Sequence, residues 1–234
     1  SLNVVDFDMA RALIAAAEEL QCPVIISVAT RHWEKIDAPV LVPSIRELCR
    51  RSTVPVALHL DHASKTQVDI IRTAIEVGFT SIMIDGSKEG YDENVRLTRE
   101  VTDLAHERGI SVEGELGAIG GEEGVADYAD AGSTPDKSVY TDPDRARDFV
   151  EATKVDALAV AVGTAHGLYR AEPDIKIDLI GRIAATCPVP LVMHGASGLD
   201  DGQYPKIVEA GISKVCYYTA MGKRAARDIH RQLD

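Results

Sequence analysis

Short apolar runs recur along the chain, and amphipathic segments separate them. Eight runs predict buried strands, at residues 2–5, 24–28, 56–61, 81–85, 111–116, 157–162, 191–195 and 214–218. Several runs are nearly continuous in Val, Ile, Leu and Ala, the pattern of parallel strands covered on both faces. Apolar side chains at helical spacing lie between the runs, at residues 9–20, 68–78 and 145–154. Strands that alternate with helices in this way predict a parallel sheet of the α/β class.

Capping residues support these boundaries. Side chains that commonly begin helices stand at Asp6, Asp8 and residues 141–143, and glycines stand where helices should end, at Gly78, Gly109 and Gly211. Eight strand–helix units fit a (β/α)8 TIM barrel better than an open doubly wound sheet. No GxGxxG follows the first strand and no GxxxxGK[ST] is present, which argues against a nucleotide-binding open sheet. We expect residues 1–234 to form a single catalytic barrel domain.

Composition and charge narrow the classes of partner. Acidic residues outnumber basic ones by 37 to 25, for a net charge of −12, and no Lys/Arg-rich patch favours nucleic acid. No apolar run approaches the roughly 18–20 residues of a membrane span, and no signal peptide is visible although the chain begins at Ser1. The four cysteines form no CxxC pair, so we expect buried thiols and a cytoplasmic protein; they are Cys22, Cys49, Cys187 and Cys216.

Polar and titratable side chains concentrate at the C-terminal ends of the predicted strands. They are Asp61 and His62, Asp85, Glu113 and Glu115, His166, His194 and Thr219. Barrel enzymes place their chemistry on this face, and a structural role alone does not predict such a bias. The connection at residues 117–141 is long and rich in Gly, Asp and Ser, so we expect either a lid or binding loop or a disordered segment.

Three of these residues, His62, His166 and His194, come from three strand ends and predict one metal site. Neutral imidazole is a good zinc ligand, and three protein ligands leave open positions for substrate. A single histidine in any of these places would more often be structural or exposed. We expect His59 to support its neighbours or to pack, and His106 to be solvated.

The carboxylates at the strand ends have two interpretations each. On a regular strand the side chains of Asp61 and His62 diverge, so Asp61 is either an acid/base group or a residue that orients a metal ligand. Asp85 and Glu115 either share a second cation or are hydrogen-bonded barrel carboxylates. The segment HGASG, at residues 194–198, is small enough for backbone N–H groups and a hydroxyl to approach an anion.

Four ordered motifs carry a resemblance over nearly the whole chain. HLDHASK, EGELGAIGGEEG, VGTAHGLY and HGASG resemble the class II, metal-dependent ketose-bisphosphate aldolases, which include fructose- and tagatose-1,6-bisphosphate aldolases. The resemblance implies a zinc-dependent (β/α)8 barrel that reversibly cleaves a ketose phosphate, through a metal-stabilised enediolate, into dihydroxyacetone phosphate and an aldehyde. It also implies a sugar-phosphate substrate and a homo-oligomer, dimer or tetramer.

The resemblance also implies roles for individual residues. His62, His166 and His194 would bind one Zn²⁺ per subunit, and Asp61 would donate a proton to the aldehyde oxygen. Glu123, the second glutamate of GGEEG, would be the mobile-loop base for the carbon-bound proton. A monovalent cation, Na⁺ or K⁺, is expected nearby. The substrate and its phosphate would contact Gly167, Gly195, Ala196, Ser197, Cys216 and Thr219.

A lysine Schiff base is the other solution to this chemistry. The sixth predicted strand contains no lysine, and we find none inside any predicted strand, since Lys65, Lys88 and Lys214 lie at strand edges. The sequence therefore favours a metal-dependent mechanism over one that uses a lysine Schiff base.

Two departures from the family lie on the catalytic face. Members usually carry Asn-x-x-Thr after strand eight, where residues 216–219 read Cys-Tyr-Tyr-Thr. After strand two the family has small residues, whereas this chain has Arg31 and His32. These two residues either influence specificity or point into solvent or a subunit contact. The family also continues with helix beyond Asp234.

Two alternatives to an aldolase follow from the same features. A noncatalytic sugar-phosphate-binding or regulatory barrel is favoured by the altered turn at Cys216, and opposed by the intact Asp61, histidines and GGEEG. A metal-dependent hydrolase barrel usually has HxH on its first strand, and the segment LNVVDF has no histidine.

Overall fold

A computed structural model describes residues 1–119, 128–129, 140–169 and 172–233 of the chain. The chain divides into two compact units, which are described one at a time. Unit 1 comprises Ser1–Glu115 with Ala152–Asp156, and unit 2 comprises Leu116–Glu151 with Ala157–Asp234. The expectation of a single catalytic domain stays a prediction.

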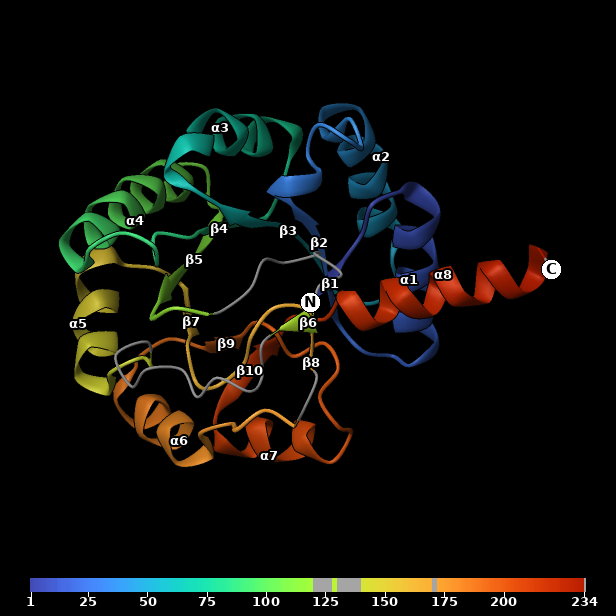
Figure 1. The fold of residues 1–234 in the computed structure, drawn as a ribbon. Helices are drawn as coiled ribbons and strands as arrows, with labels where there is room; N and C mark the ends of the chain where they lie inside the picture. The colour runs from blue at the N-terminus through green and yellow to red at the C-terminus, as the bar shows by residue number, and fades with distance from the viewer. Residues whose placement is uncertain (120–127, 130–139, 170–171, 234) are drawn as a thin grey trace. The chain divides into compact units, whose positions relative to one another are not determined.

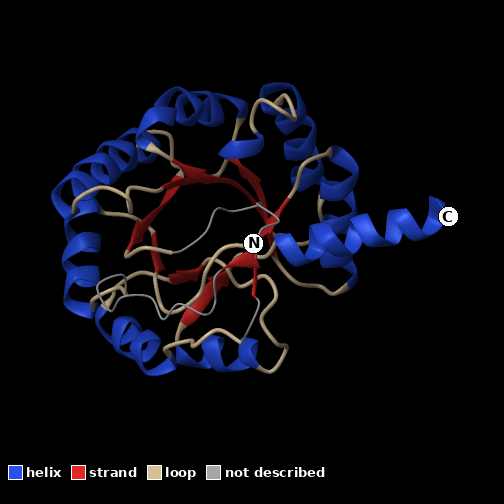
Figure 2. Cartoon of the chain, in the orientation of Figure 1, coloured by secondary structure: helices blue, strands red, loops and turns tan. Residues whose placement is uncertain are grey.

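Unit 1 is a run of parallel strands in chain order, with helices between them (Figure 1). Its strands are β1 (Leu2–Asn3), β2 (Val24–Ala29), β3 (Val56–Ala63), β4 (Ser81–Ile84) and β5 (Ser111–Leu116). Its helices are α1 (Phe7–Glu19), α2 (Ala38–Arg51), α3 (Val68–Val77) and α4 (Tyr91–His106), with 3-10 turns η1 (Thr30–His32) and η2 (Lys65–Gln67). The helices lie outside the strands (Figure 2).

Local sequence signals set the ends of these elements. The Asp6 side chain accepts a hydrogen bond of 2.7 Å from the Met9 amide and so caps α1. Gly78 ends α3 with a φ of 99°, in the left-handed region that favours glycine. The core between strands and helices is aliphatic, with Ile26, Leu58, Leu60, Ile71, Ile82 and Ile84 fully buried.

Unit 2 continues the alternation of strands and helices. Its strands are β6 (Tyr128–Ala129), β7 (Ala157–Val160), β8 (Leu168–Tyr169), β9 (Leu191–Met193) and β10 (Ile212–Val215). Its helices are α5 (Pro143–Thr153), α6 (Ile177–Thr186), α7 (Gln203–Ala210) and α8 (Thr219–Leu233). Strands β7, β9 and β10 pair in parallel, and β6 pairs with β8. Asp142 accepts a hydrogen bond from the Arg145 amide at the start of α5.

The α/β fold class of (β/α)8 TIM-barrel type is confirmed. Within the described part of the chain, eight parallel strands take the order β1-β2-β3-β4-β5-β7-β9-β10, and eight helices alternate with them. The last strand differs from its prediction, because β10 begins at Ile212, so Lys214 lies within a strand rather than at its edge. The pairing of β10 with β9 shifts register between Ile212 and Lys214, an irregularity that apolar patterning does not reveal.

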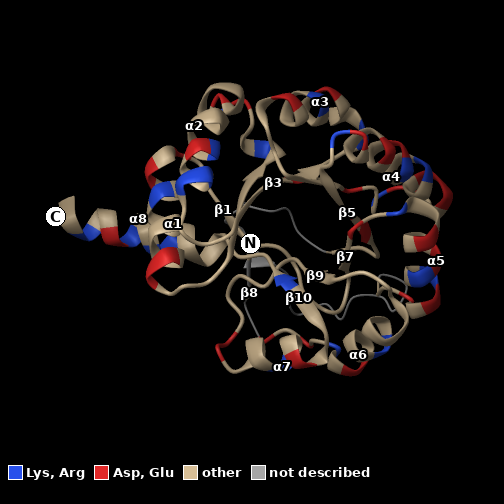
Figure 3. Ribbon diagram, turned by 180° about the vertical axis from the view of Figure 1, so that it is seen from behind, with Lys and Arg blue, Asp and Glu red and all other residues tan. Residues whose placement is uncertain are grey.

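Acidic and basic residues are interleaved along α4 (Figure 3). Arg96 pairs with Glu93 and Glu100, and Arg99 pairs with Asp103, on the exposed face of this helix. Exposed pairs of this kind contribute at most about 1 kcal/mol each, so the buried face of α4 supplies most of its attachment. No helix among the described residues is long and apolar enough to cross a membrane.

All four cysteines are free thiols, as expected, but only one is buried. Cys216 is 6 % exposed, whereas Cys49 and Cys187 are half-buried and Cys22 is exposed. The expectation of four buried thiols was therefore wrong, because Cys22 follows the end of α1 at the surface. His106 is exposed as expected, and its Nε2 lies 2.9 Å from a carboxylate oxygen of Asp156.

Candidate active site

Strand β3 contains a backbone irregularity at His62. Its φ of 53° lies in the left-handed region, and the pairing of β3 with β4 shifts between Leu60 and Ala63. The hydroxyl of Thr30, which directly follows β2, donates a hydrogen bond of 2.6 Å to the His62 carbonyl oxygen. Such a conformation costs on the order of 1–3 kcal/mol and persists where neighbours fix it. Strand β3 is therefore not regular at His62, a feature that apolar patterning does not reveal.

Replacing Thr30 with valine tests whether this bond holds His62 in place. The change keeps the side-chain shape and removes the hydroxyl. We therefore expect the free energy of unfolding to fall by about 0.5–1.5 kcal/mol. We also expect weaker zinc binding, measured by competition with a chromophoric chelator. Thr73→Val is the control, because the Thr73 hydroxyl donates to the Asp69 carbonyl on the exposed face of α3. Equal zinc affinity in both variants would contradict the role of Thr30.

Asp61 is buried among polar groups from neighbouring strands. It is 1 % exposed, and its Oδ2 accepts a hydrogen bond of 2.9 Å from the side-chain amide of Asn3 in β1. The Nε2 of His59 lies 3.9 Å from Asp61 Oδ1 and 3.9 Å from Glu113 Oε2, and its Nδ1 lies 2.8 Å from Ser81 Oγ. His59 is thus buried between two carboxylates, and Asn3 fixes one oxygen of Asp61.

His62, Asp85 and Glu115 bring three candidate cation ligands together within unit 1. One donor atom from each lies within 4.8 Å of the others. Nδ1 of His62 is 3.4 Å from Asp85 Oδ2, while Asp85 Oδ1 accepts hydrogen bonds from the Ser87 amide and hydroxyl. Burial raises the pKa of Asp85, but the hydrogen bonds from His62 and Ser87 outweigh it and hold that pKa well below its usual range. Asp85 is therefore a carboxylate at neutral pH.

Asn94, in the first turn of α4, holds the end of β5. Its side-chain amide donates a hydrogen bond of 2.8 Å to the backbone carbonyl of Glu115. Gly86 makes room for it, because a Cβ there would lie 2.3 Å from Asn94 Oδ1. Asn94 is 2 % exposed and lies on the buried face of α4 with Leu97 and Val101, where one polar residue gave no sequence signal for this role.

His166 and His194 lie next to each other in unit 2. Their ring centroids are 5.7 Å apart, and the two residues are 8 % and 0 % exposed. The Tyr169 hydroxyl accepts a hydrogen bond of 2.8 Å from the Ala165 amide and donates one of 2.7 Å to the Gly195 carbonyl. Burial raises the pKa of Tyr169 to about 12, so the hydroxyl keeps its proton. Tyr169 thereby joins the segments that carry the two histidines, a role that sequence reasoning missed.

Glycine is required where these segments approach. Gly195 has a φ of 68°, and a Cβ there would lie 2.5 Å from the Ala165 carbonyl oxygen. Gly167 also has a left-handed backbone, with a φ of 104°. These two predicted phosphate-binding positions therefore depend on glycine for backbone reasons as well.

The remaining predicted phosphate-binding residues lie around the start of α8. Ser197 is 4 % exposed, and its Oγ accepts a hydrogen bond of 2.8 Å from the Ala220 amide in the first turn of α8. The Ala196 carbonyl accepts one of 2.9 Å from the Tyr204 hydroxyl. Thr219, the first residue of α8, is buried. Ser197 therefore caps a helix N-terminus, which is the end that favours a negative charge.

Cys216 directly follows β10 and contacts a candidate metal ligand. Its Sγ lies 3.8 Å from Nε2 of His194. The backbone amide of Cys216 donates a hydrogen bond of 3.0 Å to the Met193 carbonyl, which fixes the end of β10 beside that of β9.

Arg31 and His32 form the turn η1 after β2. Arg31 is exposed and His32 is half-buried. Partial burial lowers the pKa of His32, and the charges of Arg31 and Lys35 lower it further. His32 is therefore neutral at pH 7. Glu123, the predicted mobile-loop base, lies outside the described residues.

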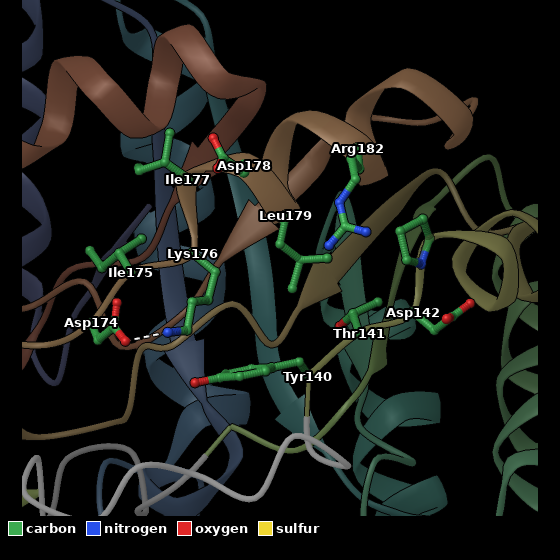
Figure 4. A pocket seen from close by; sticks show the side chains of 11 residues that line it. Tyr140, Thr141, Asp142, Asp174, Ile175, Lys176, Ile177, Asp178, Leu179 and Arg182 are labelled. Carbon is green, nitrogen blue, oxygen red and sulfur yellow. Dashed lines mark hydrogen bonds and ion pairs between the residues drawn. The ribbon is translucent and has the colours of Figure 1, made fainter.

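Unit 2 also contains a pocket of about 650 Å³ beside the N-terminal ends of α5 and α6 (Figure 4). Lys176 pairs with Asp174, and its ammonium lies 5.8 Å from the centre of the Tyr140 ring. Arg182 also lines the pocket. None of the residues predicted for the site is among those that line this pocket.

The available side chains suit a bound zinc ion. Unit 2 offers two adjacent buried imidazoles, and unit 1 offers the third imidazole beside two carboxylates. Imidazole nitrogen is a good zinc ligand, and carboxylate oxygens suit harder cations. The donor chemistry of each unit therefore fits the metal predicted from the sequence.

Residues 1–234 match the family model of fructose-bisphosphate aldolase class II. The chain belongs to this family. It is 38 % identical to the fructose-bisphosphate aldolase of Geobacillus stearothermophilus over 217 residues, which cover 91 % of this chain and 72 % of that protein. It is 39 % identical to the uncharacterized protein YdjI of Escherichia coli (strain K12) over 232 residues, or 99 % and 81 % of the two chains.

Solved structures agree with this membership in the class II aldolase family. The crystal structure of the YdjI aldolase from Escherichia coli K12 matches with a TM-score of 0.86 and 35 % identity, covering 100 % of this chain and 80 % of that one. A putative aldolase from Coccidioides immitis matches with a TM-score of 0.85 and 33 % identity, covering 97 % and 78 %. Together, the family and its aldolase members support an aldolase, a carbon–carbon lyase, over the hydrolase alternative.

Proposed function

We propose that this chain is a zinc-dependent aldolase. It reversibly cleaves a ketose phosphate, a ketose bisphosphate or a related ketose into dihydroxyacetone phosphate, or a similar three-carbon ketone, and an aldehyde. The observation that carries the proposal is the family match over residues 1–234 in a chain that retains Asp61 and the three strand-end histidines. Metal analysis combined with an aldol-cleavage assay tests it.

In this proposal His62, His166 and His194 hold one zinc ion per subunit. The ion, when bound, supplies a Lewis acid for the oxygens of the substrate on which negative charge develops. Burial of His166 and His194 supports the assignment, because an ordered and dry environment strengthens such an electrostatic contribution. A cation held by Asp85 and Glu115, monovalent in our interpretation, would lie beside His62.

Asp61 moves the proton of the substrate hydroxyl. In carbon–carbon bond formation it donates that proton to the aldehyde oxygen, and in cleavage it takes the proton from the same oxygen. The hydrogen bond from Asn3 holds one carboxylate oxygen of Asp61 in place. Glu123 is proposed to move the proton on the three-carbon product. Backbone and hydroxyl groups at Gly167, Gly195, Ala196, Ser197 and Thr219 are proposed to receive the phosphate.

A noncatalytic sugar-phosphate-binding barrel is the second candidate, and the observation in its favour is Cys216 at the position of the family's asparagine. It predicts sugar-phosphate binding without turnover. The zinc-loaded protein, assayed for aldehyde release from ketose phosphates, distinguishes the two: cleavage supports the enzyme, and binding without cleavage supports the barrel without activity.

Substrate choice is where we expect this chain to differ from the standard bisphosphate aldolases. Arg31 is exposed after β2 and carries a planar set of donors suited to carboxylate or phosphate. A charge-assisted contact of this kind is worth roughly 1.5–3 kcal/mol. We therefore expect Arg31→Ala to lower kcat/KM about 10- to 100-fold on substrates with a matching anionic group, and little on neutral ones.

The measurement is a panel of ketose phosphates and ketose acids tested against wild type and Arg31→Ala. Arg11→Ala serves as control, because Arg11 pairs with Asp8 on the exposed face of α1. If fructose-1,6-bisphosphate is the best substrate of wild type and Arg31→Ala behaves like Arg11→Ala, the specialised-substrate idea is wrong and ordinary family activity stands.

A further inference from the structure

Cys216 is set beside the ring of His194 by the sheet itself. Its amide donates to the Met193 carbonyl at 3.0 Å, so the residue after β10 is fixed next to the residue after β9. Its sulfur then lies 3.8 Å from Nε2 of His194, and both residues are buried, at 6 % and 0 % exposure. The contact joins side chains that follow neighbouring paired strands, and it does not depend on a surface loop.

The chemistry of a neutral imidazole makes this contact selective. A metal binds the ring nitrogen that lacks a hydrogen, so the other nitrogen carries the N–H. A group that accepts this N–H fixes both the tautomer and the orientation of the ring. The nitrogen that faces sulfur here is Nε2, so the nitrogen that would bind a metal in this tautomer is Nδ1. Thiol sulfur is a weak acceptor, yet a buried contact excludes water as a competitor.

The sulfur is in contact with His194 but is not grouped with the candidate metal ligands. Among the described residues, Cys216 belongs to no set of three His, Cys, Asp or Glu donor atoms that lie within 4.8 Å of one another. This grouping favours the sulfur as an acceptor for the ring N–H over the sulfur as a fourth ligand.

We infer that Cys216 is a positioning residue for His194: its sulfur accepts the Nε2–H and directs Nδ1 toward the zinc ion. This inference rests on the proposed function, because it takes His194 as a zinc ligand. It gives the departure at Cys216 a task other than contacting substrate. It also makes the affinity of this site for metal depend on a residue that does not ligate.

Zinc affinity is the first measurement, by competition with a chelator in wild type and four variants. Cys216→Ala and Cys216→Val both remove the acceptor, and valine keeps most of the volume, so a loss common to both does not come from a cavity. We expect both to bind zinc about 10- to 100-fold more weakly. Cys216→Ser retains an acceptor and should recover most of that loss. Cys187→Ala, a half-buried thiol elsewhere in unit 2, should bind like wild type.

Two spectroscopic readouts separate positioning from other roles. In ¹⁵N-histidine NMR of the zinc-loaded protein, we expect His194 to carry its proton on Nε2, with a shift of that nitrogen in Cys216→Ser. In the cobalt-substituted protein, we expect no thiolate-to-metal charge-transfer band. If the cobalt protein shows such a band, and the band disappears in Cys216→Ala, then Cys216 is a ligand and the inference is overturned. Unchanged zinc affinity in both Cys216→Ala and Cys216→Val would also overturn it.

Failure of the proposed function has a different signature. Wild type that binds no zinc, or a His194→Ala variant that binds zinc like wild type, would remove the premise that His194 is a ligand. Wild type that binds zinc through His194 while the Cys216 variants bind equally well leaves the proposed function intact and removes only the role of Cys216.

Discussion

Replacing Asp61 with asparagine is expected to slow aldol cleavage by about 10²–10⁴-fold, the usual contribution of a positioned acid/base group. The amide has nearly the shape of the carboxylate and can still accept the hydrogen bond from Asn3, but it cannot take or donate the substrate proton. Zinc content should stay at the wild-type level, because Asp61 is not a proposed ligand. Steady-state cleavage kinetics and metal analysis on the same preparation measure both quantities.

A variant of the second proposed acid/base residue, Glu123, shows whether Asp61→Asn impairs only the transfer of the hydroxyl proton. Glu123→Gln should mainly slow exchange of the carbon-bound proton of dihydroxyacetone phosphate, followed by NMR in deuterated water, while Asp61→Asn should leave that exchange largely intact. Identical effects of the two variants on cleavage and exchange would contradict separate roles. Loss of zinc from Asp61→Asn would instead indicate that Asp61 orients a metal ligand.

The backbone topology and the polar strand ends could be predicted because each follows from a local pattern. Apolar runs locate the strands. Asp6 caps the start of α1 and Gly78 ends α3, as expected. The C-terminal ends of parallel strands share one face, so chain order alone predicts that Asp85 and Glu115 approach each other, and one oxygen from each lies within 4.8 Å in the fold.

The supporting contacts could not be predicted, because they depend on three-dimensional neighbours. Asn3 is one polar residue in a short apolar run, and nothing local connects it to Asp61, 58 residues later. The left-handed backbone of His62 arises from a register shift between strands, and the partner that holds it is Thr30, 32 residues earlier. Tyr169 lies within a recognised motif, but its bond to the Gly195 carbonyl requires knowledge of how two loops meet.

Removing any one imidazole of the proposed zinc site should greatly weaken zinc binding and abolish cleavage. Residues that merely orient a ligand contribute about 10- to 100-fold to metal affinity, so loss of a ligand in His62→Ala, His166→Ala or His194→Ala should cost more than that. We expect each variant to elute from gel filtration without stoichiometric zinc and to lose cleavage as fully as wild type treated with chelator. His106→Ala is the matched control, because His106 is exposed and pairs with Asp156.

Folding must be separated from metal binding in this comparison, since His194 is fully buried and His62 has a left-handed backbone within β3. Thermal unfolding of the metal-free proteins provides the separation. A variant that unfolds like metal-free wild type and still binds no zinc has lost a ligand rather than its fold. Addition of zinc should raise the unfolding temperature of wild type and of His106→Ala, because a ligand that binds only the folded state stabilises it. Full cleavage activity in rigorously metal-free wild type would refute the zinc site, and with it the proposed mechanism for this member of the family.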